Sequence, residues 1–422
     1  MTTAIFTSLK RWLIVLFIAA QLPVAAQVQS VTMDEAIQAA LAQNALLRST
    51  EAEIKSQEFM KRTSVDIPKT SLMFMSGQYN SLNQDNNLTI TQNLPFPTVF
   101  TSSSKLHNLK VENSQHRRAM TKNELVFQLK QIGETLQYLH AREALLMRQD
   151  SLFAELVRIS SLQQATGEGT LLQRTSAETR YNEVRNQYRQ NQADLLSFNS
   201  QLAVLMNAQG QVSLIVQPFG PITTTLLNDT AEIASNPQLA YQRSLNAIAL
   251  QEKRVESNRA LPDLTVGYFN QTLIGFQQQL DGTDRYFSNK DRFSGFMVGV
   301  ALPIWFVPAH GRIKSAAYRS EATHLQSMQV ERQLHGEWTK AVQQFEKHRN
   351  SLAYYTQSAL PNAELLLRQS TLSYRTGEIS QADYRLNLQQ AVTIQEAYIQ
   401  TVLQYNLSII TLEFLAGSYS KN

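Results

Sequence analysis

Residues able to support catalysis or metal binding are scattered along the 422-residue chain and form no recognisable site. None of the seven histidines has another histidine three or four positions away, so the chain lacks a helical zinc motif. It also lacks a GxSxG motif and a phosphate-binding glycine loop. Met73 and Met75 suit a soft metal ion, but methionines in a weak strand pattern usually serve packing. We therefore predict no enzyme, no cofactor and no metal site.

A Thr-Gly-Glu turn occurs twice, each time between long polar helical stretches. Its residues are Thr166, Gly167 and Glu168 in the first copy and, 210 positions later, Thr376, Gly377 and Glu378. A glycine can take the left-handed backbone conformation that ends a helix. Each turn is therefore predicted to be the bend of a helical hairpin.

Residues that can start a new helix follow both turns. Thr170 and Gln173 have the spacing of a capping box, in which each side chain satisfies the other residue's backbone N–H. Ser380 and Asp383 form a looser version, and the positive end of the helix dipole favours the Asp383 carboxylate. Local chemistry alone thus explains Asp383 as a helix-start residue.

The 210-residue offset extends beyond the tripeptide and predicts a duplicated chain. Leu156 and Arg158, for example, match Leu366 and Arg368. The first predicted repeat, 27–230, holds a helix at 33–66, two strands at 70–97, a long hairpin with its tip at 166–170, and an equatorial segment at 208–230. The second, 231–422, holds a helix at 231–261, two strands at 263–303, and a long hairpin with its tip at 376–380.

The predicted strands alternate apolar with polar or small side chains. Leu88, Ile90 and Leu94 fall on one face of the segment 87–94, and the segment 295–302 shows the same alternation. Alternation over about ten positions is typical of transmembrane β-barrel strands. A half-buried strand of a soluble sheet alternates in the same way, so the pattern alone leaves both interpretations open. Polar loops are expected at 79–86 and 277–290.

The longest elements predicted are helices at 100–165 and 311–375. Pro361 is the only proline in these two stretches. At 1.5 Å per residue, such a helix would be roughly 100 Å long. Its apolar residues follow coiled-coil spacing, with steps of four and three from Leu125 to Leu146. Polar residues surround these narrow seams, so most of each helix is expected to face water.

The N-terminus has the pattern of a cleaved signal peptide at residues 1–26. Lys10 and Arg11 precede a short apolar run, which small residues at 24–26 follow. Cleavage before Gln27 would leave 36 basic and 34 acidic residues, and no basic run points to nucleic acid. The chain has no cysteine, so we expect neither disulfides nor a lipoprotein anchor. No later stretch is long and apolar enough for a transmembrane helix.

Four strands cannot close a barrel, and an open sheet edge cannot face lipid. Oligomerisation would solve this problem. Three copies would supply twelve strands and, from two hairpins each, twelve helices. The predicted fold class is therefore mainly α, with duplicated hairpins forming an α-barrel and four strands per chain contributing to a small membrane β-barrel.

The order of these elements resembles the TolC-type outer-membrane efflux proteins. The passage GFMVGVALPIW at 295–305 and the turn YRTGEISQADYRLN at 374–387 carry the resemblance, together with the spacing of the two repeats. It implies a homotrimeric channel in the outer-membrane lipid, with a large periplasmic tunnel. It also implies docking to a periplasmic adaptor and an inner-membrane pump, the RND type among the pumps to consider. Proteins of this type export drugs, metal ions or secreted proteins, so the resemblance leaves all three open as substrates.

The resemblance also implies a periplasmic gate at the second turn. Asp383 matches an aspartate of the constricting ring, and Tyr374 matches a tyrosine that helps to hold the closed state. The family's second aspartate is replaced by Leu386, so a double acidic ring is not expected. The six Thr-Gly-Glu residues are the predicted adaptor contacts. For Tyr374, simple packing is an equal alternative.

Two other classes of protein remain compatible with parts of the sequence. A soluble periplasmic coiled-coil adaptor, or a structural protein of that kind, would share the long helices, although it would need a lipoyl-like domain around a single hairpin. A secreted helical enzyme would share the signal peptide, although it would need an active site. Outer-membrane trimers would support the channel, and soluble monomers would support the alternatives.

Overall fold

The computed structural model describes residues 29–223 and 230–420. The predicted signal peptide at 1–26 lies outside the described residues, as does part of the predicted equatorial segment. The described chain forms two compact units. The sheet unit comprises residues 46–123, 230–339 and 415–420, and the hairpin unit comprises residues 29–45, 124–223 and 340–414. Both units combine parts of the two predicted repeats, whose limits remain predictions.

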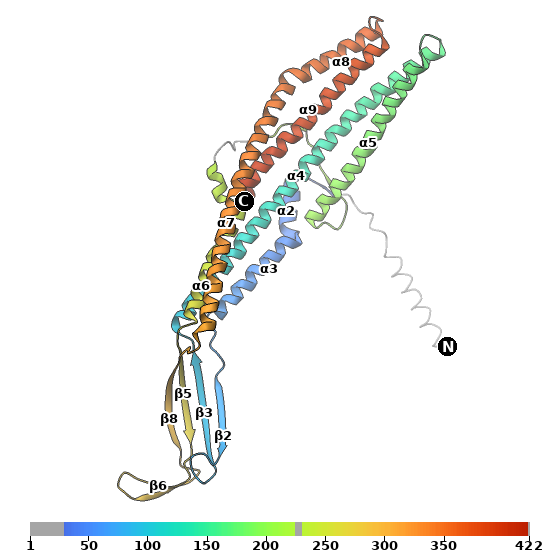
Figure 1. The fold of residues 1–422 in the computed structure, drawn as a ribbon. Coiled ribbons are helices and arrows are strands. Elements are labelled where there is room, and N and C mark those ends of the chain that lie inside the picture. The colour runs from blue at the N-terminus through green and yellow to red at the C-terminus, as the bar shows by residue number, and fades with distance from the viewer. Residues whose placement is uncertain (1–28, 224–229, 421–422) are drawn as a thin grey trace, which may run out of the picture. The chain divides into compact units, whose positions relative to one another are not determined.

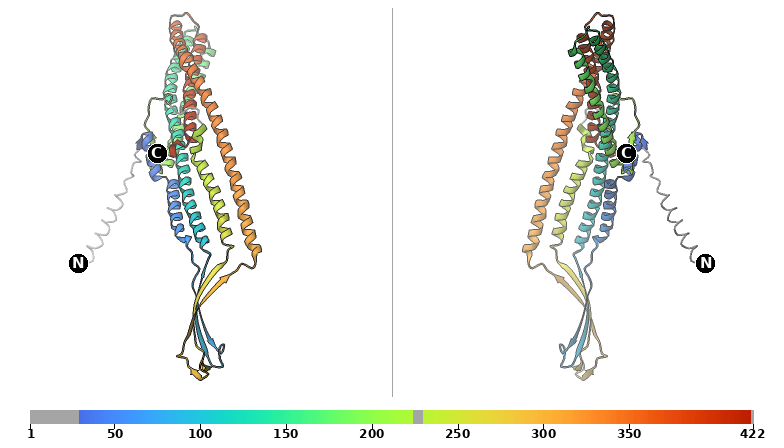
Figure 2. Two further views of the ribbon diagram at one scale, coloured as in Figure 1. Left: turned by 90° about the vertical axis from the view of Figure 1, so that its left-hand side faces the viewer. Right: turned by 90° about the vertical axis from the view of Figure 1, so that its right-hand side faces the viewer.

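The sheet unit contains a four-stranded antiparallel sheet, which lies at one end of the unit (Figure 2). Its strands are β2 (Ser71–Gly77), β3 (Asp85–Leu94), β5 (Asp263–Gln271) and β8 (Phe293–Ala301), in the spatial order β2-β3-β5-β8. The two predicted strand pairs are therefore confirmed as strands, and they join into one sheet through β3 and β5. Within this sheet, β2 and β8 are the edge strands.

The register gives the sheet one apolar face. Leu72, Ile90, Tyr268 and Phe296 lie in one row across the four strands. This face is open: Phe296 is 86% exposed and Leu72 is 68% exposed. The residues on the other face are mostly polar or small. There Gly295 leaves room for the Phe269 ring, which a Cβ atom at Gly295 would meet at 2.7 Å.

The connection between β5 and β8, where the sequence predicted a polar loop at 277–290, is partly ordered as strands. It contains a two-stranded ribbon of β6 (Gly275–Gln278) and β7 (Asp284–Phe287). The rings of Phe276 and Tyr286 pack edge to face across this ribbon, with centroids 5.3 Å apart. This local aromatic pair supplies the cross-strand contact that a polar loop would lack.

Four helices of the sheet unit follow the same spatial order as the strands. They are α3 (Ala45–Met60), the first part of α4 (Pro97–Ala165), α6 (Pro237–Asn258) and the first part of α7 (Phe306–Tyr354). Arg117 on α4 binds the Glu53 carboxylate on α3 with both distances below 3.0 Å. An Asn113–Ser244 hydrogen bond joins α4 to α6. An Arg243–Glu331 ion pair joins α6 to α7.

Several predicted helix limits were wrong. The stretch 33–66 is split into α2 (Met33–Gln43) and α3 because Asn44 takes an extended ψ of 124°. The stretch 231–261 begins its α-helix only at Pro237, after Asn236 has capped the first turn with its side chain. The second long helix begins at Phe306 rather than at 311, since Pro308 lies in the first turn, where its missing N–H costs nothing.

The helices of the hairpin unit form two antiparallel pairs (Figure 1). One pair is α4 with α5 (Leu171–Met206), and the other is α8 (Leu360–Arg375) with α9 (Gln381–Leu415). A π-helix at Tyr355–Ala359 joins α7 to α8. This wider turn accommodates Pro361, because it interrupts the regular helical hydrogen-bond pattern at the point where the proline has no N–H to donate.

The predicted coiled-coil seam of α4 is confirmed as the core of the hairpin unit. Leu129 and Leu136 are completely buried, and they pack with Leu202 of α5 and with Ala36 and Ala40 of α2. A short parallel pair of β1 (Gln29–Val31) and β4 (Val212–Leu214) lies beside this core. Within the described residues, no helix is both long and apolar enough to span a membrane.

Candidate functional site

The two Thr-Gly-Glu turns have the same backbone geometry. Gly167 and Gly377 both have φ of +79°, the left-handed conformation predicted from the sequence. After each glycine, the glutamate N–H returns to a carbonyl five residues earlier: Glu168 to Gln163 at 2.9 Å, and Glu378 to Ser373 at 2.8 Å. This is the hydrogen bond of a Schellman motif. The tips of both hairpins are therefore fixed by local backbone chemistry.

The capping interactions that start α5 and α9 are confirmed. Thr170 and Gln173 form a full capping box, with the Thr170 N–H 2.8 Å from the Gln173 side-chain oxygen. At the second turn the Asp383 N–H donates to the Ser380 hydroxyl oxygen at 3.2 Å. The same hydroxyl donates to the Asp383 carboxylate at 2.6 Å. Asp383 therefore stabilises the start of α9.

The Asp383 carboxylate is nevertheless exposed to solvent. Its bond to Ser380 uses one oxygen, so the group keeps capacity to accept further hydrogen bonds or to attract a cation. The equivalent residue of the first turn, Gln173, has no charge. The second turn is thus the more acidic of the two at this position.

Tyr374 is packed within its own hairpin. Its ring stacks on that of Tyr384, with centroids 4.7 Å apart and planes 3° from parallel. Its hydroxyl oxygen is buried without a partner in hydrogen-bonding geometry. Burial raises the pKa of this hydroxyl. The nearby Gln163 side chain lowers the pKa in part, although its contact with the hydroxyl does not have hydrogen-bonding geometry. In the single chain, Tyr374 acts through its ring.

The two hairpins contact each other just behind their tips. The Gln381 amide donates to the Ser160 hydroxyl, and the Arg385 guanidinium donates to that of Ser176. Tyr384, Leu388 and Val392 of α9 share a buried cluster with Phe153 and Leu156 of α4 and with Ala177 and Val184 of α5. Motion of one tip is therefore coupled to packing against the other.

The sequence patterns did not predict these inter-hairpin residues. Tyr384, Leu388 and Val392 are spaced four apart, which is a helical stripe that could have been recognised. Gln381 and Arg385 gave no signal, because single polar residues near a helix start are common on exposed surfaces. Among the described residues, no three His, Asp or Glu side chains gather as a metal site would require.

Comparison with known proteins assigns the fold. No protein-family model and no curated protein matches the chain. Several solved structures do match over nearly their whole length. The outer-membrane channel OprN has a TM-score of 0.77 at 15% identity, covering 92% of this chain and 90% of its own. CusC, described for its transmembrane channel formation, has a TM-score of 0.75 at 13% identity, covering 91% and 92%.

A third structure, the outer-membrane protein VceC from Vibrio cholerae, has a TM-score of 0.74 at 16% identity, covering 91% of this chain and 96% of its own. These neighbours are TolC-family proteins. The chain therefore has the TolC-type fold, in which α-helical hairpins are combined with a β-barrel contribution. The resemblance predicted from element order is confirmed at the level of the fold.

Proposed function

We propose that the protein is the outer-membrane channel of a tripartite efflux or secretion system, a passive conduit from periplasm to exterior. The observation that carries this proposal is the four-stranded sheet, whose apolar face is exposed along its length. A soluble protein rarely leaves such a face uncovered. A lipid environment suits it, and the same face disfavours the soluble-adaptor alternative.

The channel is proposed to be a homotrimer. The edge strands β2 and β8 have no outer neighbour within the described sheet. In lipid, these open edges would leave backbone groups without hydrogen bonds. Three copies would join edge to edge into a twelve-stranded barrel, and their hairpins would join into a twelve-helix tunnel. No step of this function calls for catalysis by the chain.

The hairpin turns are proposed to contact a periplasmic adaptor that links the channel to an inner-membrane pump. Their shared geometry supports this, since two equivalent rigid tips offer two equivalent docking points. Thr166, Gly167 and Glu168 form one tip contact, and Thr376, Gly377 and Glu378 form the other. We take an RND-type pump as the first partner to test.

Asp383 and Tyr374 are proposed as gate residues at the periplasmic entrance. Threefold symmetry would bring three exposed Asp383 carboxylates around the axis. Like charges repel, and in a narrow wet pore they attract cations. The stack of Tyr374 on Tyr384 would hold α8 against α9 in the closed state.

Membrane fractionation followed by mass measurement of the detergent-extracted particle tests the proposal. We expect a heat-resistant particle of three chains in the outer-membrane fraction, with each mature chain beginning near Gln27. A bacterial host that lacks its own channel of this fold should regain export when the chain is produced with its cognate adaptor and pump. A soluble monomer would contradict the proposed function.

A further inference from the structure

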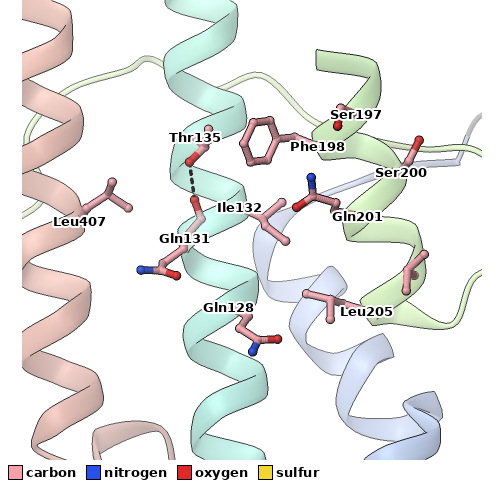
Figure 3. A pocket seen from close by; sticks show the side chains of 11 residues that line it. Gln128, Gln131, Ile132, Thr135, Ser197, Phe198, Ser200, Gln201, Leu205 and Leu407 are labelled. Carbon is pink, nitrogen blue, oxygen red and sulfur yellow. Dashed lines mark hydrogen bonds between the residues drawn. The ribbon is translucent and has the colours of Figure 1, made fainter. Parts of the chain in front are cut away.

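A large pocket opens on the hairpin unit between α4, α5 and α9 (Figure 3). Its volume is about 890 Å³, within the range of sites that bind drug-sized molecules. Its apolar lining consists of Ile132 on α4, Phe198, Val204 and Leu205 on α5, and Leu407 on α9. In Figure 3, Ile132 and Phe198 converge between the two helices of the first hairpin.

The polar part of the lining is neutral. It consists of Gln128, Gln131 and Gln201, with the hydroxyls of Thr135, Ser197 and Ser200. No lining residue carries a charge. The Thr135 and Ser200 hydroxyls already donate to backbone carbonyls of their own helices but can still accept. These groups and the glutamine amides can bond a neutral polar group, whereas a charged ligand would lose its hydration without gaining a counter-charge. This chemistry selects an uncharged, largely apolar molecule with a few hydrogen-bonding groups.

The chain segment 215–217, called the strap below, lies on the opposite face of α4. The Gln137 amide donates to the Ile215 carbonyl and accepts from the Gln217 N–H, both at 2.9 Å. Met33 of α2 covers Gly133 on the same face, where a Cβ atom would lie 2.4 Å from its sulfur. At 3.6 residues per turn, pocket residues Gln131 and Thr135 lie roughly half a turn around the helix from Gly133 and Gln137.

The strap and the pocket therefore lie on opposite sides of the same helix. If the hairpins close into the proposed ring, the strap must run outside, because three copies inside would obstruct the passage. The pocket then belongs to the inner wall. This step rests on the proposed function.

From this geometry we propose that the pocket is a binding site for exported small molecules of the uncharged, apolar class. It would hold such molecules transiently on the inner wall of the tunnel. The channel would then contribute to substrate preference instead of leaving it wholly to the pump. Weak binding suits this role, because a molecule held tightly would not leave.

The chemistry of the lining favours a small molecule over a protein partner. Polar groups are scattered among apolar ones in the lining, as in small-molecule sites. A stable interface with a second copy would need a broad contact of about 800 Å² on each partner. A second copy seated in the pocket is the competing outcome of the test.

Binding can be measured with two dyes that differ by one charged group. N-phenyl-1-naphthylamine is uncharged, and 8-anilinonaphthalene-1-sulfonate is its sulfonated counterpart. With the full-length protein in lipid nanodiscs, and empty nanodiscs subtracted, we expect saturable fluorescence with the uncharged dye and weaker binding of the sulfonate. Val204→Asp should weaken binding of the uncharged dye by about tenfold or more, because it places a charge in the apolar lining.

Leu196→Asp is the matched control. Leu196 is 67% exposed on α5 but does not line the pocket, whereas Val204 is 75% exposed and does. The control should bind the dye like the unmodified protein. Equal binding by the Val204→Asp variant, or stronger binding of the sulfonate, would overturn the proposal. So would loss of the trimer in Val204→Asp alone, since Val204 would then belong to an interface between copies.

An export assay separates this inference from the proposed function. In cells with the adaptor and pump, Val204→Asp should slow efflux of the uncharged dye several-fold and leave efflux of a charged dye unchanged. Failure of the unmodified chain to export either dye would refute the proposed channel. Equal export of both dyes by Val204→Asp and Leu196→Asp would refute only the wall site.

Discussion

At the scale of single residues, Asp383 combines a structural task with an exposed charge. Asp383→Asn should keep the helix start, because the amide oxygen can still accept the hydrogen bond that the Ser380 hydroxyl donates to the Asp383 carboxylate at an oxygen–oxygen distance of 2.6 Å. The variant should lower cation selectivity and divalent block in planar-bilayer conductance, because the ring of negative charge is gone. Gln173→Asn is the control, because it exchanges one neutral residue for another at the equivalent position of the first turn. Unchanged selectivity and block would reduce Asp383 to a helix-start residue.

Two variants of Tyr374 can separate the role of its ring from the role of its hydroxyl. Tyr374→Phe keeps the stack on Tyr384 and removes a hydroxyl without a partner in hydrogen-bonding geometry, so closed-state leakage should not rise. Tyr374→Ala removes the stack, which is worth about 0.5–1.5 kcal/mol beyond burial, and should raise leakage. Conductance of the closed channel measures both. Raised leakage in Tyr374→Phe would mean that the hydroxyl bonds to another chain in the trimer.

The free energy of unfolding should depend on pH through the Glu134 carboxyl. Burial raises the pKa of this carboxyl above its ordinary 4.5, while the Asn406 amide, which donates to it at 2.9 Å, and Lys130 lower it in part. The protonated group thus contributes stability that is complete below about pH 4.5 and is lost as the pH rises through the folded-state value. The thermal midpoint of the unmodified protein, relative to Glu134→Gln, should therefore rise between pH 7 and pH 4.5. A difference that is flat over this window would contradict the assignment.

At the scale of elements, the two turns depend on glycine for backbone reasons alone. A Cβ atom at Gly167 or Gly377 would meet nothing within 4 Å, so the cost of Gly→Val lies in φ of +79°. This strain is about 1–3 kcal/mol for a residue that avoids the left-handed region. Either variant should distort its tip and reduce export several-fold, while trimers still insert in the membrane.

Gly336→Ala is the control for the turn variants, since Gly336 lies within α7, where an added Cβ atom also meets nothing. It should be neutral or slightly stabilising, because alanine favours a helix. Export rates and heat-resistant trimers, measured for all three variants, decide the matter. Normal export by both turn variants would rule out a role of tip geometry in docking.

At the scale of the whole molecule, the two faces of the sheet should respond oppositely to charge. Val298 is 82% exposed on the apolar face, and Met73 is 54% exposed on the other. Val298→Lys should cost about 2–4 kcal/mol near the middle of the bilayer and deplete outer-membrane trimers. Met73→Lys should be tolerated, because the proposed barrel would direct it into a wet interior. Equal yields of heat-resistant trimer from the two variants would argue against a lipid-facing sheet.

Local signals predicted the turns and caps because every participating group lies within about six residues. Gly377, Ser380 and Asp383 carry the second turn, and their hydrogen bonds agree with the sequence pattern. The seam of α4 was predictable for a similar reason, since period and burial are properties of one helix. The helix limits were less accurate where one residue, such as Asn44, ends a helix through a backbone angle that composition does not specify.

The sequence by itself determined the long helices, the four strands of the main sheet and the two glycine turns, and which strand face would be apolar. Only the tertiary structure decided that β3 pairs with β5, that Tyr374 stacks on Tyr384, and that Ile132, Phe198 and Leu407 line one pocket. The reason is physical. Secondary structure follows from interactions between near neighbours, whereas these contacts join residues far apart in the chain or across a turn, and many alternative pairings satisfy the same alternation and the same seam.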